Sequence, residues 1–263
     1  MDFIFEYYFD FSIMGEEFSR VLEGFWITLK LSIISGVLAL AWGLVLSLLR
    51  QLPGRLFAPV RWITIGYIDA FRGVPLLLVL LLVSGFLSAA QAEDVIPREL
   101  GLPTWFGETS PFWYGVISLT LTYGAYMAEV YRAGIEAVPE GQMEAARSLG
   151  MSHGQAMRDV VVPQAIRKVV PPLLNDFIAL MKDTSLVSFL GLAEVVQVGF
   201  DIQTERFNGS GLALGAILFL VVTIPLARLV DYLIARQQRR VARSGGGDEP
   251  EATGPPATGM AGA

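Results

Sequence analysis

The sequence predicts an all-α membrane protein, a polytopic bundle of about five transmembrane helices. Hydrophobic residues make up 53% of its 263 residues and charged residues only 17%, whereas a soluble domain usually carries about a quarter charged residues. Four windows contain no Asp, Glu, Lys or Arg, namely 31–49, 73–92, 109–128 and 207–227. Each approaches the roughly 20 apolar residues that a helix needs to cross the hydrocarbon core. This pattern excludes a soluble globular core.

Membrane spans are expected at five places, about 25–49, 63–90, 111–135, 169–193 and 209–235. The fourth is the least regular, because Asp176, Lys182 and Asp183 interrupt its apolar residues. We also expect Pro171 and Pro172 to disturb the helix just before Asp176, since proline has no N–H to donate.

The distribution of lysine and arginine supports five spans and predicts their orientation. With five spans, three Lys or Arg residues lie on one side, in segments 1–22, 91–110 and 194–206. Twelve lie on the other side, in segments 50–61, 132–168 and 236–263. Lys and Arg accumulate in short cytoplasmic loops. We therefore expect a multi-pass protein of the cell membrane, with its N-terminus outside and its C-terminus in the cytoplasm.

The chain divides into three parts. Residues 1–22 form an extracytoplasmic segment that mixes aromatic residues with five acids. Its composition fits either the water–lipid boundary, where aromatic rings are favoured, or a loosely ordered extension. Residues 23–240 form the membrane domain, which includes a polar cytoplasmic loop at 137–165. The tail, 241–263, is rich in Gly, Pro and Ala and is expected to be disordered.

Composition excludes several kinds of site. The chain has no cysteine and a single histidine, His153, so a disulfide, a thiolate nucleophile and a His/Cys metal cluster are ruled out. The net charge of −6 argues against a nucleic-acid partner. A membrane-embedded enzyme is a weak alternative, because His153 lies in the polar loop.

The loop between the third and fourth spans is expected to form two short helices. Pro139 suits the start of the first helix, where a missing N–H is no loss, and Gly150 suits its end, where a positive φ is common. Ser152 and Gln155 have the spacing of a capping box for the second helix. We expect Pro163 to close that helix.

The first of these helices carries a surface of low relief. Ala145 and Ala146 lie between Glu144 and Arg147. Such a surface would allow the helix to sink deeply into a groove of another protein. A solvated hairpin without a partner is the plain alternative.

The same loop contains a spaced pattern that resembles the EAA signature of binding-protein-dependent importers of the ATP-binding-cassette (ABC) class. The family pattern is E-A-A, three residues, G, nine residues, I, one residue and L-P. The chain matches it with Glu144-Ala145-Ala146, Gly150, Val160 and Val162-Pro163. The two valines replace Ile and Leu, which are similar in size and polarity.

Four longer stretches extend the resemblance to permeases of the histidine/glutamine type, which carry polar amino acids. They are TLKLSIISG (28–36), YIDAFRGVPLLL (67–78), YGAYMAEVYRAGIEAVPEGQMEAARSLG (123–150) and NDFIALMKDTSLVSFLGLAEV (175–195). The resemblance covers about residues 23–235 and implies a fold like that of type I ABC importers.

The resemblance also implies partners. They are a second permease subunit, identical or related, a cytoplasmic ABC ATPase dimer and an extracytoplasmic solute-binding protein. The chain has no P-loop and no Gly-Lys dipeptide, so we expect ATP to be bound by the partner ATPase and this chain to be non-catalytic and free of cofactors. The residues expected to couple it to the ATPase are Glu144, Ala145, Ala146, Arg147, Gly150 and Pro163.

Charged residues within the spans are candidates for a substrate pathway, because such residues usually face a bundle interior or a water-filled path. They are Asp69, Arg72, Glu129, Asp176, Lys182 and Asp183. We expect Asp69 and Asp176 to contact an ammonium group and Arg72 to meet a carboxylate or pair with Asp69. Alternatively, Asp69–Arg72 and Lys182–Asp183 are structural pairs.

The function expected from the sequence is a permease that forms the translocation path for a polar amino acid. A compatible solute such as ectoine, or an opine, is an alternative cargo within the same importer class. A secondary transporter or channel would explain the charges within the spans but not the EAA-spaced loop.

Overall fold

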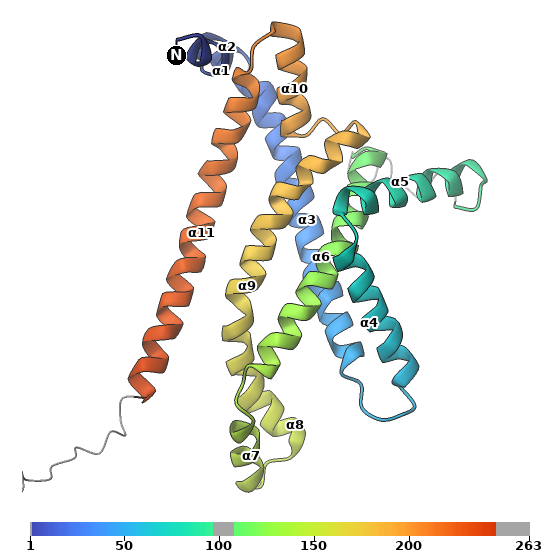
Figure 1. Cartoon of the computed structure of the whole chain (residues 1–263), viewed down its shortest axis with the longest axis vertical. Helices are drawn as coiled ribbons and strands as arrows, with labels where there is room; N and C mark the ends of the chain where they lie inside the picture. The colour runs from blue at the N-terminus through green and yellow to red at the C-terminus, as the bar shows by residue number, and fades with distance from the viewer. Residues whose placement is uncertain (1, 97–107, 246–263) are drawn as a thin grey trace, which may run out of the picture.

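The bundle is built from helices of very different length, with no strand among the residues that the structure describes, 2–96 and 108–245 (Figure 1). It is a computed structural model. The elements are α1 Asp2–Tyr8, α2 Phe11–Glu16, α3 Phe18–Arg50, α4 Ala58–Gly73, α5 Leu76–Ala92, α6 Ser110–Glu136, α7 Glu140–Ser148, α8 His153–Ala156, a π-helical turn Met157–Val161, α9 Val162–Asp183, a 3₁₀ segment Thr184–Leu190, α10 Val195–Arg206 and α11 Ser210–Gly245. The predicted all-α bundle is confirmed.

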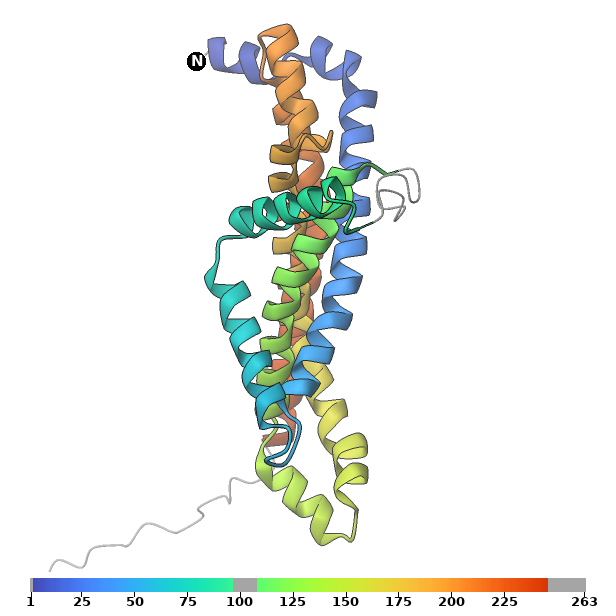
Figure 2. The ribbon, with the colours of Figure 1, turned by 90° about the vertical axis from the view of Figure 1, so that its right-hand side faces the viewer.

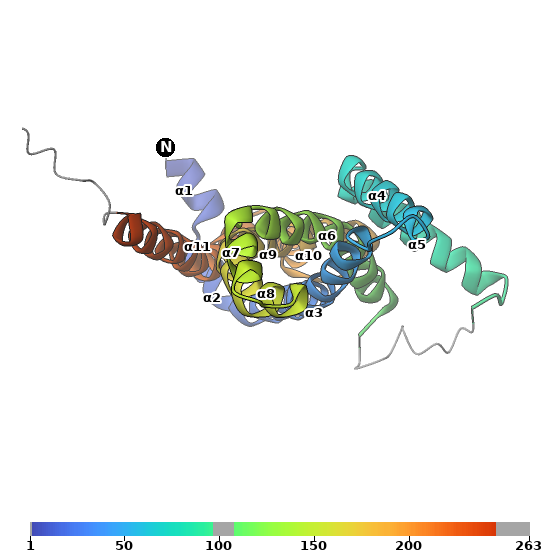
Figure 3. The same cartoon turned by 90° about the horizontal axis from the view of Figure 1, so that it is seen from below.

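Two helices, α3 and α11, are long and apolar enough to cross a membrane by themselves. Two bent pairs also reach that length when their members are taken together. One is α4 with α5. The other is α10 with the continuous helical stretch 153–190, which runs from α8 through α9 to the 3₁₀ segment. Seen from the α7–α8 end, α4 and α5 lie on one side of the central helices and α11 lies on the other (Figure 3).

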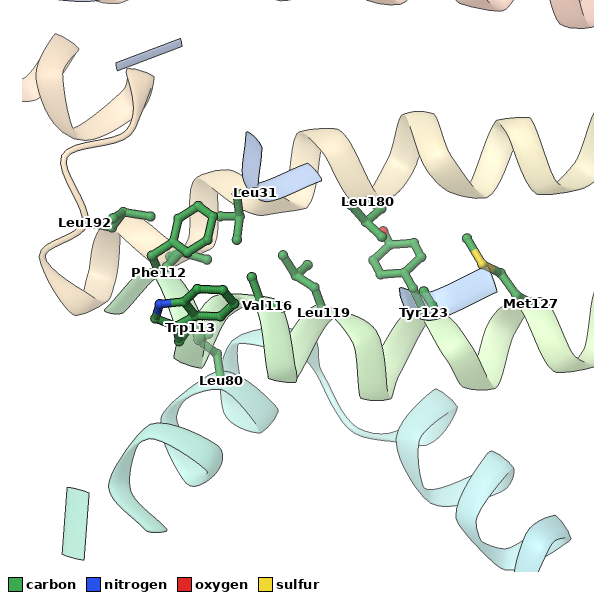
Figure 4. Packing of buried hydrophobic residues seen from close by; sticks show 12 residues of the cluster. Leu31, Leu80, Phe112, Trp113, Val116, Leu119, Tyr123, Met127, Leu180 and Leu192 are labelled. Atoms are coloured by element: carbon green, nitrogen blue, oxygen red, sulfur yellow. The ribbon is translucent and has the colours of Figure 1, made fainter. Parts of the chain in front are cut away.

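The centre of the bundle is the contact between α3 and α6. Its core includes Leu31, Phe112, Leu119, Tyr123 and Leu180, which converge from α3, α6 and α9 (Figure 4). The helices approach closely because glycines line the crossing. A Cβ on Gly43 of α3 would lie 2.9 Å from the carbonyl oxygen of Gly124 on α6.

The second expected span is not one helix. The chain turns by 112° between α4 and α5, so residues 63–90 form a broken pair of helices in place of the one continuous helix that was expected. The break follows from Pro75, because the residue before a proline is driven out of the helical region. Val74 is extended, with φ −96° and ψ 134°.

The fourth expected span contains a continuous helix, α9, which its prolines do not end. Pro171 and Pro172 lie inside α9. We expected Pro163 to close the preceding short helix, but it lies in the first turn of α9. A π-helical turn, Met157–Val161, comes directly before it. The wider spacing of this turn leaves room for the ring of Pro163 at the start of α9, so the chain stays helical there.

Residues 194–206, expected as a loop, contain the helix α10. Glu194 caps it, since its carboxylate accepts hydrogen bonds from the backbone N–H groups of Val196 and Gln197, both at 2.9 Å. The same carboxylate accepts a hydrogen bond of 3.3 Å from the hydroxyl of Thr28 on α3. The cap therefore ties α10 to α3.

The two ends of the bundle carry different elements. The helices α1 and α2 lie beside the α10–α11 turn at one end, and α7 and α8 project from the other (Figures 1 and 2). The expected boundary between residues 22 and 23 falls inside α3. The boundary between 240 and 241 falls inside α11, and 246–263 lie outside the described residues.

Candidate functional site

The projecting α7–α8 loop has the local structure that the sequence predicts. Pro139 precedes the first turn of α7, and Gly150 has a φ of +86° just after its end. The N–H of Met151 donates to the carbonyl of Ala146 at 3.3 Å, which closes the last turn of the helix. Both hydrogen bonds of the Ser152–Gln155 capping box are present.

The two alanines of this loop have different environments. Ala145 is exposed between Glu144 and Arg147, but Ala146 is only 4% exposed. The expectation that both alanines form an outward surface is therefore wrong for Ala146. It faces inward because α7 packs against α8 and the π-helical turn.

Sequence reasoning missed the most prominent apolar side chain of the loop. Leu149 is 84% exposed, directly after α7 and before Gly150. Within the loop, the buried residues Val138, Val161 and Ala165 form a small core that holds it together. The loop thus presents a strongly exposed apolar side chain among polar ones on a packed support. The signal was present as an apolar residue beside a helix-ending glycine.

Where α6 approaches the loop, an ion cluster joins it to α3 and α4. Glu129 of α6 pairs with Arg50 of α3, with Arg132 one turn along α6 at 2.7 Å, and with Arg72 of α4 at 3.9 Å. Its side chain is 15% exposed. The sequence marks Glu129 only as one charge within a span, because the partners Arg50 and Arg72 are distant along the chain.

We expect Glu129→Gln to lower the free energy of unfolding by ~2 kcal/mol, because three arginines would lose their shared counter-charge. This is less than the ~3–5 kcal/mol of a fully buried pair, since the arginines are partly exposed. Glu136→Gln is the matched control. Glu136 pairs with Arg132 but is 60% exposed, and its loss should change little. Thermal unfolding of both variants in detergent measures this. Equal midpoints for the two would contradict the role given to Glu129.

Asp176 is the pathway candidate with the most distinctive environment. Its Oδ2 atom is buried and receives no hydrogen bond from any of the described residues. Arg72 lies within electrostatic reach of it. A cavity of about 350 Å³ opens beside it, lined by Lys168, Pro171, Pro172, Asn175, Asp176 and Ile234. This volume is within the range of small-molecule sites, roughly 300–1,000 Å³.

The other predicted pathway residues are placed differently. Asp69 is exposed on α4, and within the described ranges no ion pair joins it to Arg72. The pairing considered for these two residues is therefore wrong; Arg72 contacts Glu129 and lies over the ring of Tyr126, at 5.7 Å from its centroid. The side chain of Asp183 accepts a hydrogen bond from Tyr123 at 2.8 Å.

Comparison with protein families gives one match that spans most of the chain. A model described as "Binding-protein-dependent transport system inner membrane component" matches residues 40–240.

Two curated relatives illustrate the similarity. The arginine transport system permease protein ArtQ of Bacillus subtilis (strain 168) is 35% identical over 200 residues, which cover 76% of this chain and 83% of that protein. The glutamate/aspartate import permease protein GltK of Escherichia coli O157:H7 is 33% identical over 236 residues, which cover 88% of this chain and 99% of that protein.

Solved structures of ABC transporters are also similar to this chain. A crystal structure of an amino acid ABC transporter with histidines aligns with a TM-score of 0.72 and 32% identity, over 86% of this chain and 98% of that one. An inward-facing structure of the MetNI methionine ABC transporter aligns with a TM-score of 0.63 over 83% of this chain and 98% of that one. At 20% identity, the second likeness concerns the fold alone.

Proposed function

The chain belongs to the family of inner-membrane components of binding-protein-dependent transport systems, and on that premise we propose that it forms the transmembrane path for a polar amino acid in an ATP-driven importer. The observation that carries the choice of cargo is the buried, unpartnered Oδ2 of Asp176 beside a cavity. The names of the relatives, which include arginine and glutamate/aspartate permeases, support the same class.

The charges near Asp176 suit a zwitterion. A buried carboxylate without a donor is costly, and the ammonium group of a passing amino acid would supply the missing donors. Arg72, within electrostatic reach of Asp176, would attract the carboxylate of the same molecule. Asp69 remains a pathway candidate on the exposed face of α4. The contact with cargo would be brief, because a permease must release what it binds.

Coupling to ATP hydrolysis is proposed for the α7–α8 loop. Glu144, Ala145 and Arg147 would contact a cleft of a cytoplasmic ABC ATPase dimer, and Leu149 would fill an apolar pocket there. ATP would be bound by that partner, and this chain would bind no cofactor. Movement of the loop would reach the spans as a rigid-body motion, since α7 follows α6 and the 153–190 helix begins at α8.

The two ends of the bundle would face opposite sides of the membrane and meet different partners. The end that carries α1 and α2 would face outward and receive the solute-binding protein. The opposite end, with α7–α8 and the end of α11, would lie in the cytoplasm, as the excess of Lys and Arg there supports. A second permease subunit, identical or related, would complete the pathway.

Asp176→Asn tests this proposal in the assembled complex in proteoliposomes. We expect uptake of the cargo amino acid to fall by ~10–100-fold, because a charge-assisted hydrogen bond contributes about 1.5–3 kcal/mol. Asp231→Asn is the matched control, since Asp231 is 68% exposed in the C-terminal half of α11 and its change should leave uptake intact.

The uptake measurement uses labelled arginine, glutamine, glutamate, ectoine and an opine. Equal uptake by the Asp176→Asn variant and the wild type would reduce Asp176 to a structural residue. Uptake of only ectoine or the opine would replace the proposed cargo class. Uptake without an ATPase would contradict the importer mechanism.

A further inference from the structure

The N-terminal helices are attached to the rest of the chain by a set of polar contacts. The N–H of Gly209, in the α10–α11 turn, donates to the carbonyl of Tyr7 at 2.8 Å. The side-chain amide of Gln203 donates to the hydroxyl of Tyr7 at 2.9 Å, and the N–H of Asp10 donates to the hydroxyl of Ser210 at 2.9 Å. These contacts attach the segment to the α10–α11 turn, while most side chains of α1 stay exposed.

Ion pairs reinforce the attachment at the end of α2. Arg206 of α10 pairs with Glu16 at 3.1 Å and with Glu17 at 2.9 Å. Arg20, in the first turn of α3, pairs with Glu205 at 2.6 Å. Residues 2–17 are therefore a docked, ordered element. Of the two interpretations that composition allowed, the loosely ordered extension is excluded.

The exposed surface of this element is largely apolar, with the Glu6 side chain also exposed on α1. Phe11 is 82% exposed, Phe3 77%, Phe5 65% and Ile4 58%. The ring of Phe5 packs only against that of Phe9, with centroids 5.7 Å apart, among the described ring pairs. Exposed apolar side chains in such a group indicate a contact with another apolar phase.

The position of the segment indicates which phase that is. The helix α1 lies across the end of the bundle, at a steep angle to α3 and α11 (Figures 1 and 2). It contacts the start of α11. Exposed apolar side chains follow along that helix at Ile217, Leu220 and Val221. Ile217 lies seven residues from Ser210, or ~10 Å along the helix axis. The aromatic side chains thus lie at the end of α11, about two helical turns from the point where its exposed apolar surface begins.

We propose that α1 and the first turn of α2 are an interfacial anchor, lying in the boundary between lipid headgroups and acyl chains. Aromatic rings are favoured at this depth, and a helix parallel to the membrane plane suits it. Residues 1–17 contain five acids and no Lys or Arg, so attraction to anionic lipids cannot contribute. The anchor is therefore held by burial of apolar surface, and in a neutral bilayer its depth is independent of salt.

Site-directed spin labelling tests the anchor, and the absence of cysteine from the chain makes each introduced cysteine unique. Nitroxide labels are placed at Phe5→Cys and Phe11→Cys in the full chain, in phosphatidylcholine nanodiscs. Val221→Cys, at a position 62% exposed on α11, is the hydrocarbon reference. Gly141→Cys, an open position on α7, is the water reference. The measured quantity is the ratio of collision rates with oxygen and with a nickel chelate.

At Phe5 and Phe11 we expect ratios several-fold above the Gly141 reference and below the Val221 reference, unchanged by salt in phosphatidylcholine and not raised by added phosphatidylglycerol. Ratios equal to the Gly141 reference would overturn the anchor. So would labels that become protected only when a purified solute-binding protein is added, because the surface would then belong to that partner. A depth that increases with phosphatidylglycerol would overturn burial as its cause.

Discussion

Gly150→Val is expected to abolish transport while leaving the membrane bundle folded. Gly150 has a φ of +86°, a conformation that costs an ordinary residue ~1–2 kcal/mol and a β-branched residue more. Valine would force the turn between α7 and α8 to change, and Leu149 and Arg147 would move away from their positions on the proposed ATPase surface. ATP-driven uptake in proteoliposomes, together with co-purification of the ATPase, measures the effect.

Gly150→Asn is the matched control for this prediction. Asparagine adopts the left-handed region more readily than other residues with a side chain, so it should retain most of the transport. Equal transport by the valine and asparagine variants would show that the turn geometry is not what the ATPase requires. Loss of transport in both variants would indicate that the ATPase contacts the glycine itself.

Gly43→Leu is expected to have the largest effect on stability. A Cβ there would lie 2.9 Å from both the Gly124 carbonyl oxygen and the Met127 Cβ atom on α6, and a leucine would force α3 and α6 apart. Overpacking of this kind costs ~1–3 kcal/mol, and occasionally more. We expect the upper part of that range, because the obstacle is backbone. The measurement is the thermal unfolding midpoint in detergent.

Gly66→Leu is the control, since no atom lies within 4 Å of a Cβ at Gly66 on α4. Leucine is also the better helix former, so this variant should be as stable as the wild type. If both leucine variants unfolded at the same temperature, the close contact between α3 and α6 would not be a source of stability.

Local structure was predictable where neighbouring residues determine it. The ends of α7 and the capping box at Ser152 depend on side chains within four residues, and both predictions are confirmed. The expectation that Pro163 closes a helix was wrong, and Pro171 and Pro172 lie within α9 without ending it. A proline removes one hydrogen bond, but a π-helical turn and the surrounding helices can compensate for it.

The site was predictable in part. Asp176 and Arg72 stand out as charges in apolar segments, and the structure brings them within electrostatic reach of each other. Their further environment could not be foreseen. The pairing of Arg72 with Glu129 and not with Asp69 depends on how α4 lies against α6, and the burial of Ala146 depends on how α7 packs on the turn after α8.

The sequence by itself determined the membrane class, the helical architecture and the outline of the α7–α8 loop, because apolar length and capping residues act within a single segment. Tertiary structure decided the 112° bend between α4 and α5, the attachment of Tyr7 to Gly209 and the partners of Glu129. The physical reason is that these features depend on distances between segments far apart in the chain. Such distances are set only when the helices pack.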